Sequence, residues 1–150
     1  MHSNHFRTAS WLHACGKEPG NEQHLSTQIG CHLEEFCEFL RTINIESPTG
    51  ASSNATQEVA AILDAIATNL KQGTVLARIY DREMALDALC DCEVTGNGVA
   101  YLAGMSKEEA DRRVLDSNDA KLVDGRPVLS DGGKIMKPAG WAPPSLDGLF

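Results

Sequence analysis

Three glutamates within five residues are the part of this sequence best suited to chemistry. Glu34, Glu35 and Glu38 lie in a stretch whose apolar residues recur at the spacing of an amphipathic helix. At about 100° per residue, the three carboxylates fall on the side opposite the apolar stripe. Like charges on one helical face repel one another, so the cluster is either solvated or neutralised by a cation. Carboxylates suit a hard cation such as Mg²⁺, so a solvated acidic face and a metal site both stay open.

The elements that must position these glutamates are predicted to be helices. We expect helices over about 6–15, 22–44, 56–72, 78–102 and 106–115. The second helix is expected to face the core with Ile29, Leu33, Phe36, Leu40 and Ile43. The third is expected to be a core helix through Val59, Ile62, Leu63, Ile66 and Leu70.

A second carboxylate stripe is predicted on the fourth helix. Glu83, Asp87 and Asp91 follow one another every four residues, whereas Gly96 and Gly98 indicate a kink or a close approach of another group. Antiparallel packing in a bundle could bring the two stripes face to face. Four or five carboxylates would then hold about two divalent ions, an arrangement suited to phosphoryl chemistry on a polyphosphate.

The last helix and the tail have different compositions. Ser106 and Glu109 have the spacing of a capping box, which predicts where the last helix begins. From residue 116 onward, glycines and prolines exclude regular helix, and a short hairpin is expected around residues 123–129. This tail concentrates basic residues in an otherwise acidic chain, namely Lys121, Arg126, Lys134 and Lys137, together with Trp141.

The bulk composition restricts the class of protein. The 150 residues fit one domain, and a net charge of -8 argues against a nucleic-acid polymer or an anionic membrane as partner. No apolar run is long enough to span a bilayer, and the first residues lack the pattern of a signal peptide. The five cysteines form no C-x-x-C pair, so reduced thiols are expected. Together these features predict a cytoplasmic protein.

The motifs taken together resemble a known superfamily. Residues 34–38 have the form E-E-x-x-E, the first half of the signature of the all-α nucleoside triphosphate pyrophosphohydrolases, which include MazG, the dimeric dUTPases and phosphoribosyl-ATP pyrophosphohydrolase. The second half is normally E-x-x-D on a later helix, and residues 86–91 lie at that place. Residues 117–121, residues 131–137 and the Trp-Ala-Pro-Pro ending resemble the tail of MazG-like and phosphoribosyl-ATP-pyrophosphohydrolase-like proteins. The resemblance covers about 13–146.

This resemblance implies a fold, an assembly and a reaction. The expected fold is an all-α, MazG-like helical bundle with an irregular C-terminal tail, a single domain over 1–150 that is helical over about 6–115. The expected assembly is a homodimer or homotetramer. The expected reaction uses Mg²⁺, or Mn²⁺ in its place, and splits a nucleoside triphosphate between its α- and β-phosphates into a nucleoside monophosphate and pyrophosphate. A role in nucleotide-pool housekeeping is also implied.

The resemblance also assigns roles to residues of this chain. The catalytic carboxylates are expected to be Glu34, Glu35 and Glu38. The metal ligands are expected to be Glu35, Glu38, Asp87 and Asp91. The residues expected to bind the nucleotide phosphates are Asn118, Lys121, Lys134 and Lys137.

One position departs from the superfamily pattern. Counting back three residues from Asp91 reaches Ala88, where the superfamily has glutamate, and the nearest substitute is Asp87 at four. Either this chain uses a D-x-x-x-D variant, or one metal site and the activity are weakened. The alternative function is therefore a non-catalytic nucleotide- or metal-binding protein of the same fold. A third reading is an acidic helical interaction protein without a ligand, against which the basic tail argues.

Overall fold

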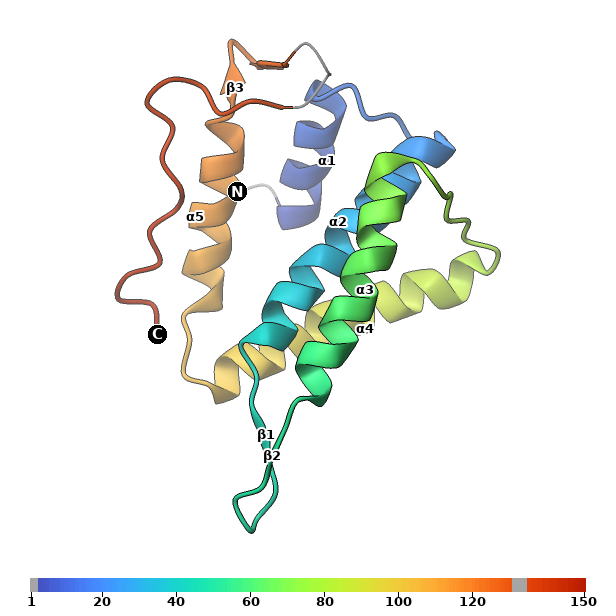
Figure 1. Ribbon diagram of the computed structural model, residues 1–150. Coiled ribbons are helices and arrows are strands. Elements are labelled where there is room, and N and C mark those ends of the chain that lie inside the picture. The colour runs from blue at the N-terminus through green and yellow to red at the C-terminus, as the bar shows by residue number, and fades with distance from the viewer. Residues whose placement is uncertain (1–2, 131–134) are drawn as a thin grey trace. The chain divides into compact units, whose positions relative to one another are not determined.

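The computed structural model describes residues 3–130 and 135–150, and the described chain is mainly helical (Figure 1). Its helices are α1 Asn4–Ala14, α2 Glu22–Arg41, α3 Ala55–Gln72, α4 Arg82–Leu102 and α5 Lys107–Asp119. Its two short antiparallel strand pairs are β1 Ile45–Glu46 with β2 Ser52–Ser53, and β3 Leu122–Val123 with β4 Arg126–Pro127. The helical class predicted from the sequence is therefore confirmed, and so is the short hairpin in the tail.

Helix boundaries differ from the expected ones at several ends. The exclusion of regular helix from residue 116 onward is wrong, because α5 continues to Asp119 and the first glycine of the tail comes only at Gly125. α4 begins at Arg82 because Asp81 is its N-cap, with a side-chain oxygen that accepts a hydrogen bond from the Met84 N–H at 2.9 Å. α5 begins where expected, but the predicted capping box is wrong. The Ser106 side chain makes no capping hydrogen bond, and the Glu109 carboxylate is bound by Arg112 and Arg113.

The contacts divide the chain into two compact units. One is Pro19–Tyr80, with α2 and α3, and the other combines Met1–Glu18 with Asp81–Phe150, which hold α1, α4, α5 and the tail. Each unit is described by itself below. The expected single MazG-like domain stays a prediction.

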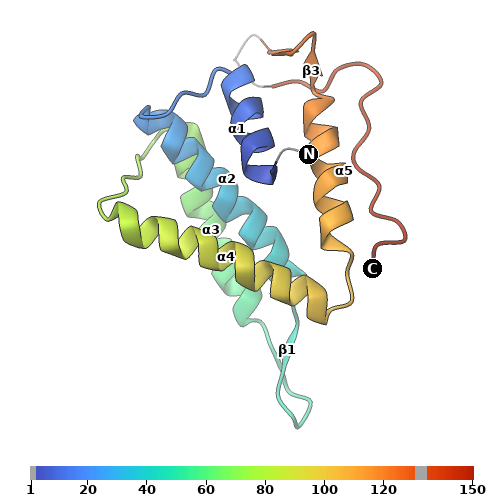
Figure 2. The same cartoon turned by 180° about the vertical axis from the view of Figure 1, so that it is seen from behind.

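The unit Pro19–Tyr80 is an antiparallel helical hairpin of α2 and α3 (Figure 2). The side of α2 that is buried against α3 carries Gly30 and Cys37, and the facing side of α3 carries Ala60 and Ala67. Ser26, also buried on α2, accepts a 2.9 Å hydrogen bond from the Ala77 N–H beyond the end of α3. A Cβ atom added at Gly30 would lie 2.8 Å from the Ala67 carbonyl oxygen. Small side chains therefore let the two helices approach closely.

Two ion pairs also cross the hairpin interface. The Lys71 ammonium lies 2.5 Å from a Glu34 carboxylate oxygen, and the Arg41 guanidinium binds Asp64. The hydrogen bond from Arg41 lowers the pKa of the Asp64 carboxyl, and burial raises the pKa of the neighbouring Cys37 thiol. The polar groups at this interface are therefore partnered as burial requires.

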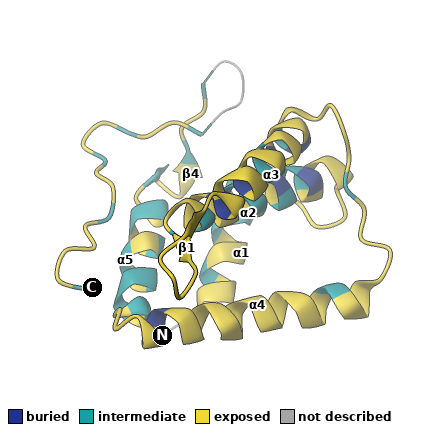
Figure 3. Ribbon diagram, turned by 60° about the horizontal axis from the view of Figure 1, so that its bottom comes forward, coloured by how far each residue is buried: buried dark blue, intermediate teal, exposed yellow. Residues whose placement is uncertain are grey.

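The predicted core of this hairpin is wrong at four positions, whereas Leu70 is buried as predicted. Phe36 is 47% exposed, and Val59, Ile62 and Ile66 are 47%, 64% and 45% exposed. Each of these apolar residues stands next to a position that faces the other helix, so about 100° of helical rotation turns it away. Figure 3 shows the buried residues of α2 and α3 confined to narrow stripes. The core of the hairpin consists of small residues and Leu70.

Helix α4 is continuous and largely exposed. It runs through Gly96 and Gly98 without interruption, and among the described atoms of its own unit none lies within 4 Å of a Cβ built at either glycine. The close approach predicted from these glycines is therefore absent from that unit. Ala100 is the buried residue of this helix. In the described ranges, 3–130 and 135–150, we find no helix whose length and apolarity would let it cross a bilayer.

We predict opposite effects for the same substitution at two helical glycines. Gly30→Ala should lower the free energy of unfolding by about 1–3 kcal/mol, because the new methyl group overlaps the Ala67 carbonyl and the Lys71 side chain. Gly96→Ala should raise it by about 0.5–1 kcal/mol, because the site has room and alanine favours helix. Urea unfolding followed by circular dichroism measures both, and a stabilised Gly30→Ala variant would contradict the close packing.

Candidate functional site

The three predicted catalytic glutamates share α2 but differ in environment. Glu34 is half-buried, and its carboxylate accepts a 2.5 Å hydrogen bond from the Lys71 ammonium. That contact also raises the pKa of Lys71, so the ammonium stays charged at neutral pH. Glu35 and Glu38 are exposed on the outer side of the helix, and within the described chain no ion pair forms at Glu38. Glu38 is therefore better placed than Glu34 to act on a ligand.

The predicted metal ligands are distributed over both units. Glu35 and Glu38 belong to α2 in the unit Pro19–Tyr80, whereas Asp87 and Asp91 are exposed on α4 in the other unit. Among the described residues, no three histidine, cysteine, aspartate or glutamate side chains are gathered to hold a metal ion. As they stand in each unit, these carboxylates therefore do not fit a divalent ion. The D-x-x-x-D variant around Ala88 stays a prediction.

The predicted phosphate-binding residues do come together. Around the indole of Trp141, the Lys137 ammonium lies 4.3 Å and the Lys121 ammonium 5.5 Å from the ring centroid. Lys121 also donates a 2.8 Å hydrogen bond to the Asn118 side-chain oxygen. Lys134, the fourth predicted residue, lies outside the described residues. We call Asn118, Lys121, Lys137 and Trp141 the lysine–tryptophan cluster.

The cluster is built on the last turn of α5. The final carbonyls of a helix lack partners within the helix, and here two indoles provide them. The Trp11 N–H of α1 donates to the Asn118 carbonyl at 2.9 Å, and the Trp141 N–H of the tail donates to the Ser117 carbonyl at 2.9 Å. The sequence spacing offers no signal that these two tryptophans bind consecutive carbonyls.

The lysines of this cluster carry positive charge that the protein does not neutralise. Within the described residues, neither Lys121 nor Lys137 forms an ion pair with a carboxylate. Elsewhere in the same unit, Arg7 binds Asp116 and Asp119, and further pairs join Lys107 to Asp111 and both Arg112 and Arg113 to Glu109. Two ammonium groups near one aromatic ring repel each other, so an anion bound between them would be stabilised.

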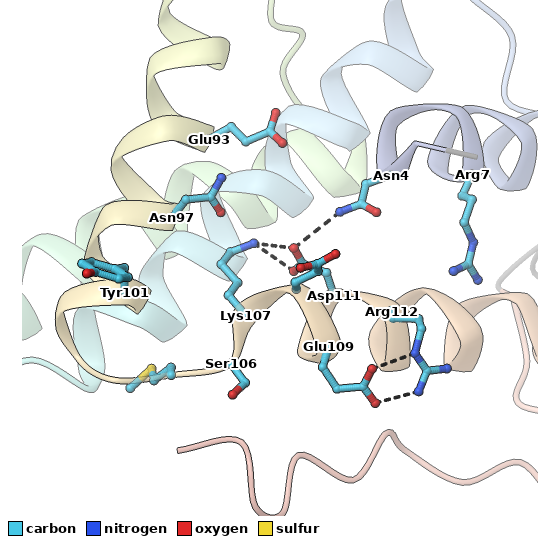
Figure 4. A pocket seen from close by; sticks show the side chains of 12 residues that line it. Asn4, Arg7, Glu93, Asn97, Tyr101, Ser106, Lys107, Glu109, Asp111 and Arg112 are labelled. Carbon is cyan, nitrogen blue, oxygen red and sulfur yellow. Dashed lines mark hydrogen bonds and ion pairs between the residues drawn. The ribbon is translucent and has the colours of Figure 1, made fainter. Parts of the chain in front are cut away.

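A polar pocket in the same unit has a different character (Figure 4). It has a volume of about 900 Å³ and is lined by residues of α1, α4 and α5. Its cations Arg7, Lys107 and Arg112 are all paired with carboxylates, whereas its Glu93 and Glu108 have no ionic partner among the described residues. An anionic phosphate chain would meet unneutralised carboxylates there. The pocket therefore suits a triphosphate less well than the lysine–tryptophan cluster does.

Comparison of the chain with protein-family profiles, with characterised protein sequences and with solved structures finds no match.

The network around Glu109 makes α5 sensitive to acid. Hydrogen bonds from Arg112 and Arg113 lower the pKa of Glu109 from 4.5 to about 2. These ion pairs therefore stabilise the fold above the ordinary pKa, and their contribution is lost as pH falls from 4.5 through about 2.

We expect Glu109→Gln to lower the free energy of unfolding at neutral pH and to leave it nearly unchanged near pH 2. Urea unfolding of wild type and variant over that pH range measures the difference. Glu108→Gln is the matched control, because the neighbouring Glu108 has no ion-pair partner among the described residues. A pH-independent difference for Glu109→Gln would show that the ion pairs are not its cause.

Proposed function

We propose that this protein is a nucleoside triphosphate pyrophosphohydrolase that releases a nucleoside monophosphate and pyrophosphate. The observation that carries the proposal is the lysine–tryptophan cluster. Three of the residues assigned to phosphate binding by the sequence resemblance, Asn118, Lys121 and Lys137, gather around Trp141 in the folded unit. Asn118 and Lys121 are three residues apart at the end of α5, and the tail brings Lys137 and Trp141 to them. A shared anionic ligand would account for two ammonium groups beside one ring.

The cluster has the chemistry that a polyphosphate requires. Two ammonium groups offer strong donors to phosphate oxygens, and the Asn118 amide adds a neutral one. The acidic composition of the whole chain, with a net charge of -8, disfavours anions elsewhere, so a local basic site would select the phosphate end of the ligand. A short phosphate chain fits this pattern better than a nucleic-acid polymer, which would need an extended basic surface.

Exposed carboxylates are the groups that we propose act on the attacking water. Glu38 is exposed on α2 and Asp91 on α4, and either could orient or deprotonate the attacking water. Glu34 is a weaker candidate because Lys71 holds it. The requirement for Mg²⁺ comes from the resemblance alone, since within neither described unit are three carboxylates gathered around one point. A homodimer or homotetramer and a cytoplasmic housekeeping role are proposed on the same basis.

The decisive test is pyrophosphate release from a panel of ribo- and deoxyribonucleoside triphosphates with Mg²⁺ or Mn²⁺. We expect turnover by the native chain and a loss of about a hundredfold or more in both Glu38→Gln and Asp91→Asn. Glu58→Gln is the control, because Glu58 is an exposed carboxylate of α3 outside both stripes. Turnover that survives both substitutions would exclude these carboxylates from the reaction.

A non-catalytic nucleotide-binding protein is the second candidate. One observation favours it: Ala88 stands where the superfamily has glutamate. In this case the lysine–tryptophan cluster would bind the nucleotide, and no pyrophosphate would be released.

Binding can be measured separately from turnover by thermal shift. A nucleoside triphosphate should raise the melting temperature of the native chain, because a ligand that binds only the folded state stabilises it. The double variant Lys121→Ala, Lys137→Ala should lose most of that shift. Arg126→Ala, which removes one positive charge from the neighbouring strand β4, should retain it. An equal loss in both would indicate a diffuse charge effect rather than a defined site.

A further inference from the structure

Residues 141–149 of the tail lie along α5 and run in the opposite direction to the helix (Figure 1). Near the end of the helix, the Ser117 side chain donates a 3.3 Å hydrogen bond to the Ala142 carbonyl. Just before the helix begins, the Ser106 N–H donates to the Leu149 carbonyl at 2.7 Å. The contacts therefore follow opposite orders in the two segments. We call residues 141–149 the strap.

Arg113 joins the middle of the strap to the helix. Its Nη1 atom donates a 2.9 Å hydrogen bond to the Ser145 carbonyl and a 3.5 Å hydrogen bond to the Asp147 carbonyl. Its Nε atom donates to a Glu109 carboxylate oxygen at 2.8 Å, and this ion pair holds the guanidinium in place on the helix. A guanidinium has its donors in one rigid plane, so a single side chain can bind the carboxylate and the strap at once.

The strap buries little apolar surface that could hold it without these hydrogen bonds. Leu146 is 38% exposed, and Phe150, which follows the strap, is 83% exposed. No residue of the strap, which the structure describes throughout, is fully buried. Hydrophobic stabilisation is roughly proportional to the apolar area removed from water, so it is small here. The docking of the strap therefore depends on polar contacts such as those of Arg113.

The strap begins at Trp141, the aromatic residue of the lysine–tryptophan cluster. Lys121 follows directly after the C-cap of α5, whereas Lys137 belongs to the tail and lies over the Trp141 ring. The two ammonium groups come together because the strap lies on the helix. Their mutual repulsion opposes this arrangement, and the hydrogen bonds along the strap offset it. An anion bound between them would remove that repulsion and favour the docked strap.

We propose that Arg113 is a positioning residue of the lysine–tryptophan cluster and acts by fastening the strap to α5. The inference rests on the proposed function, because it takes a phosphate chain as the anion that the cluster binds. Arg113 binds Glu109 and the strap, so it affects the ligand through Trp141 and Lys137 rather than by contact. Docking of the strap and binding of the anion are thereby linked, and each favours the other by the same factor.

Two neighbouring arginines of α5 separate this role from a general effect of charge. Arg112 and Arg113 both bind Glu109, but among the described residues only Arg113 also binds the strap. We expect Arg113→Ala to weaken the binding of inorganic triphosphate to the full-length chain about tenfold, as measured by isothermal titration calorimetry. Arg112→Ala, the matched control, removes the same charge and should change this affinity by less than about twofold.

Docking of the strap can be measured without any ligand by limited proteolysis. Chymotrypsin cleaves after aromatic residues and leucine, so cleavage after Trp141 or Leu146 reports how often the strap opens. Arg113→Ala should be cleaved there about tenfold faster than the native chain, and Arg112→Ala at the native rate. Inorganic triphosphate should slow the cleavage of the native chain, which a contact unconnected with the cluster would not produce.

Arg113→Lys keeps the test valid if the alanine variant does not fold. Lysine retains the positive charge and can still pair with Glu109, but it lacks the planar fork, so it should behave like Arg113→Ala. Native triphosphate affinity in variants whose strap opens would overturn this inference and leave the proposed function standing. An equal loss of affinity in Arg112→Ala would also overturn it. A native chain that binds no triphosphate would overturn the phosphate-binding role of the cluster as well.

Discussion

The close approach of two helices at Gly30 is the constraint on which the hairpin depends. Glycine at this position lets the backbone of α2 reach the Ala67 carbonyl, and Cys37 and Ala60 complete a contact made of small residues. Helices that meet through small side chains bury little apolar area for each turn of contact. The larger apolar residues are consequently left at the sides of the contact. The same feature that holds the hairpin together therefore leaves Phe36 and Ile62 exposed.

The other unit is organised by polar contacts at the C-terminal end of α5 and along its length. At its C-terminal end, two indoles bind consecutive carbonyls and draw α1 and the tail onto one helix. Along the helix, Arg7, Lys107, Arg112 and Arg113 are neutralised by carboxylates. Lys121 and Lys137 beside Trp141 are not among these pairs. Two such cations beside one indole are the place where we propose that an anion binds.

The sequence predicted the helices well because their apolar spacing and caps are local signals. All five predicted helices exist. α4 begins late, at Arg82, where Asp81 caps it, whereas α2 ends early, at Arg41, and α5 runs on to Asp119. The core could not be predicted in the same way, since hydrophobicity alone favoured Phe36 and Ile62 over Gly30 and Ser26. Which stripe faces the partner helix depends on how close the backbones come, and that distance is a property of two segments together. Among the site residues, the roles of Asn118, Lys121 and Lys137 were predicted from a resemblance. The hydrogen bonds of Trp11 and Trp141 depend on tertiary structure and could not be predicted.

The two ion pairs of the hairpin also determine the register in which its helices pair. Glu34 and Arg41 are seven residues apart on α2, and their partners Lys71 and Asp64 are seven apart on α3. Seven residues are about two helical turns, so sliding α3 along α2 by seven residues leaves the same face of α3 against α2. Such a slip is therefore the mispairing that these two helices must avoid. In one direction the slip places Arg41 opposite Lys71, and in the other it places Glu34 opposite Asp64. Either slip sets like charges against each other, so the alternation of charge protects this hairpin from misalignment while it folds.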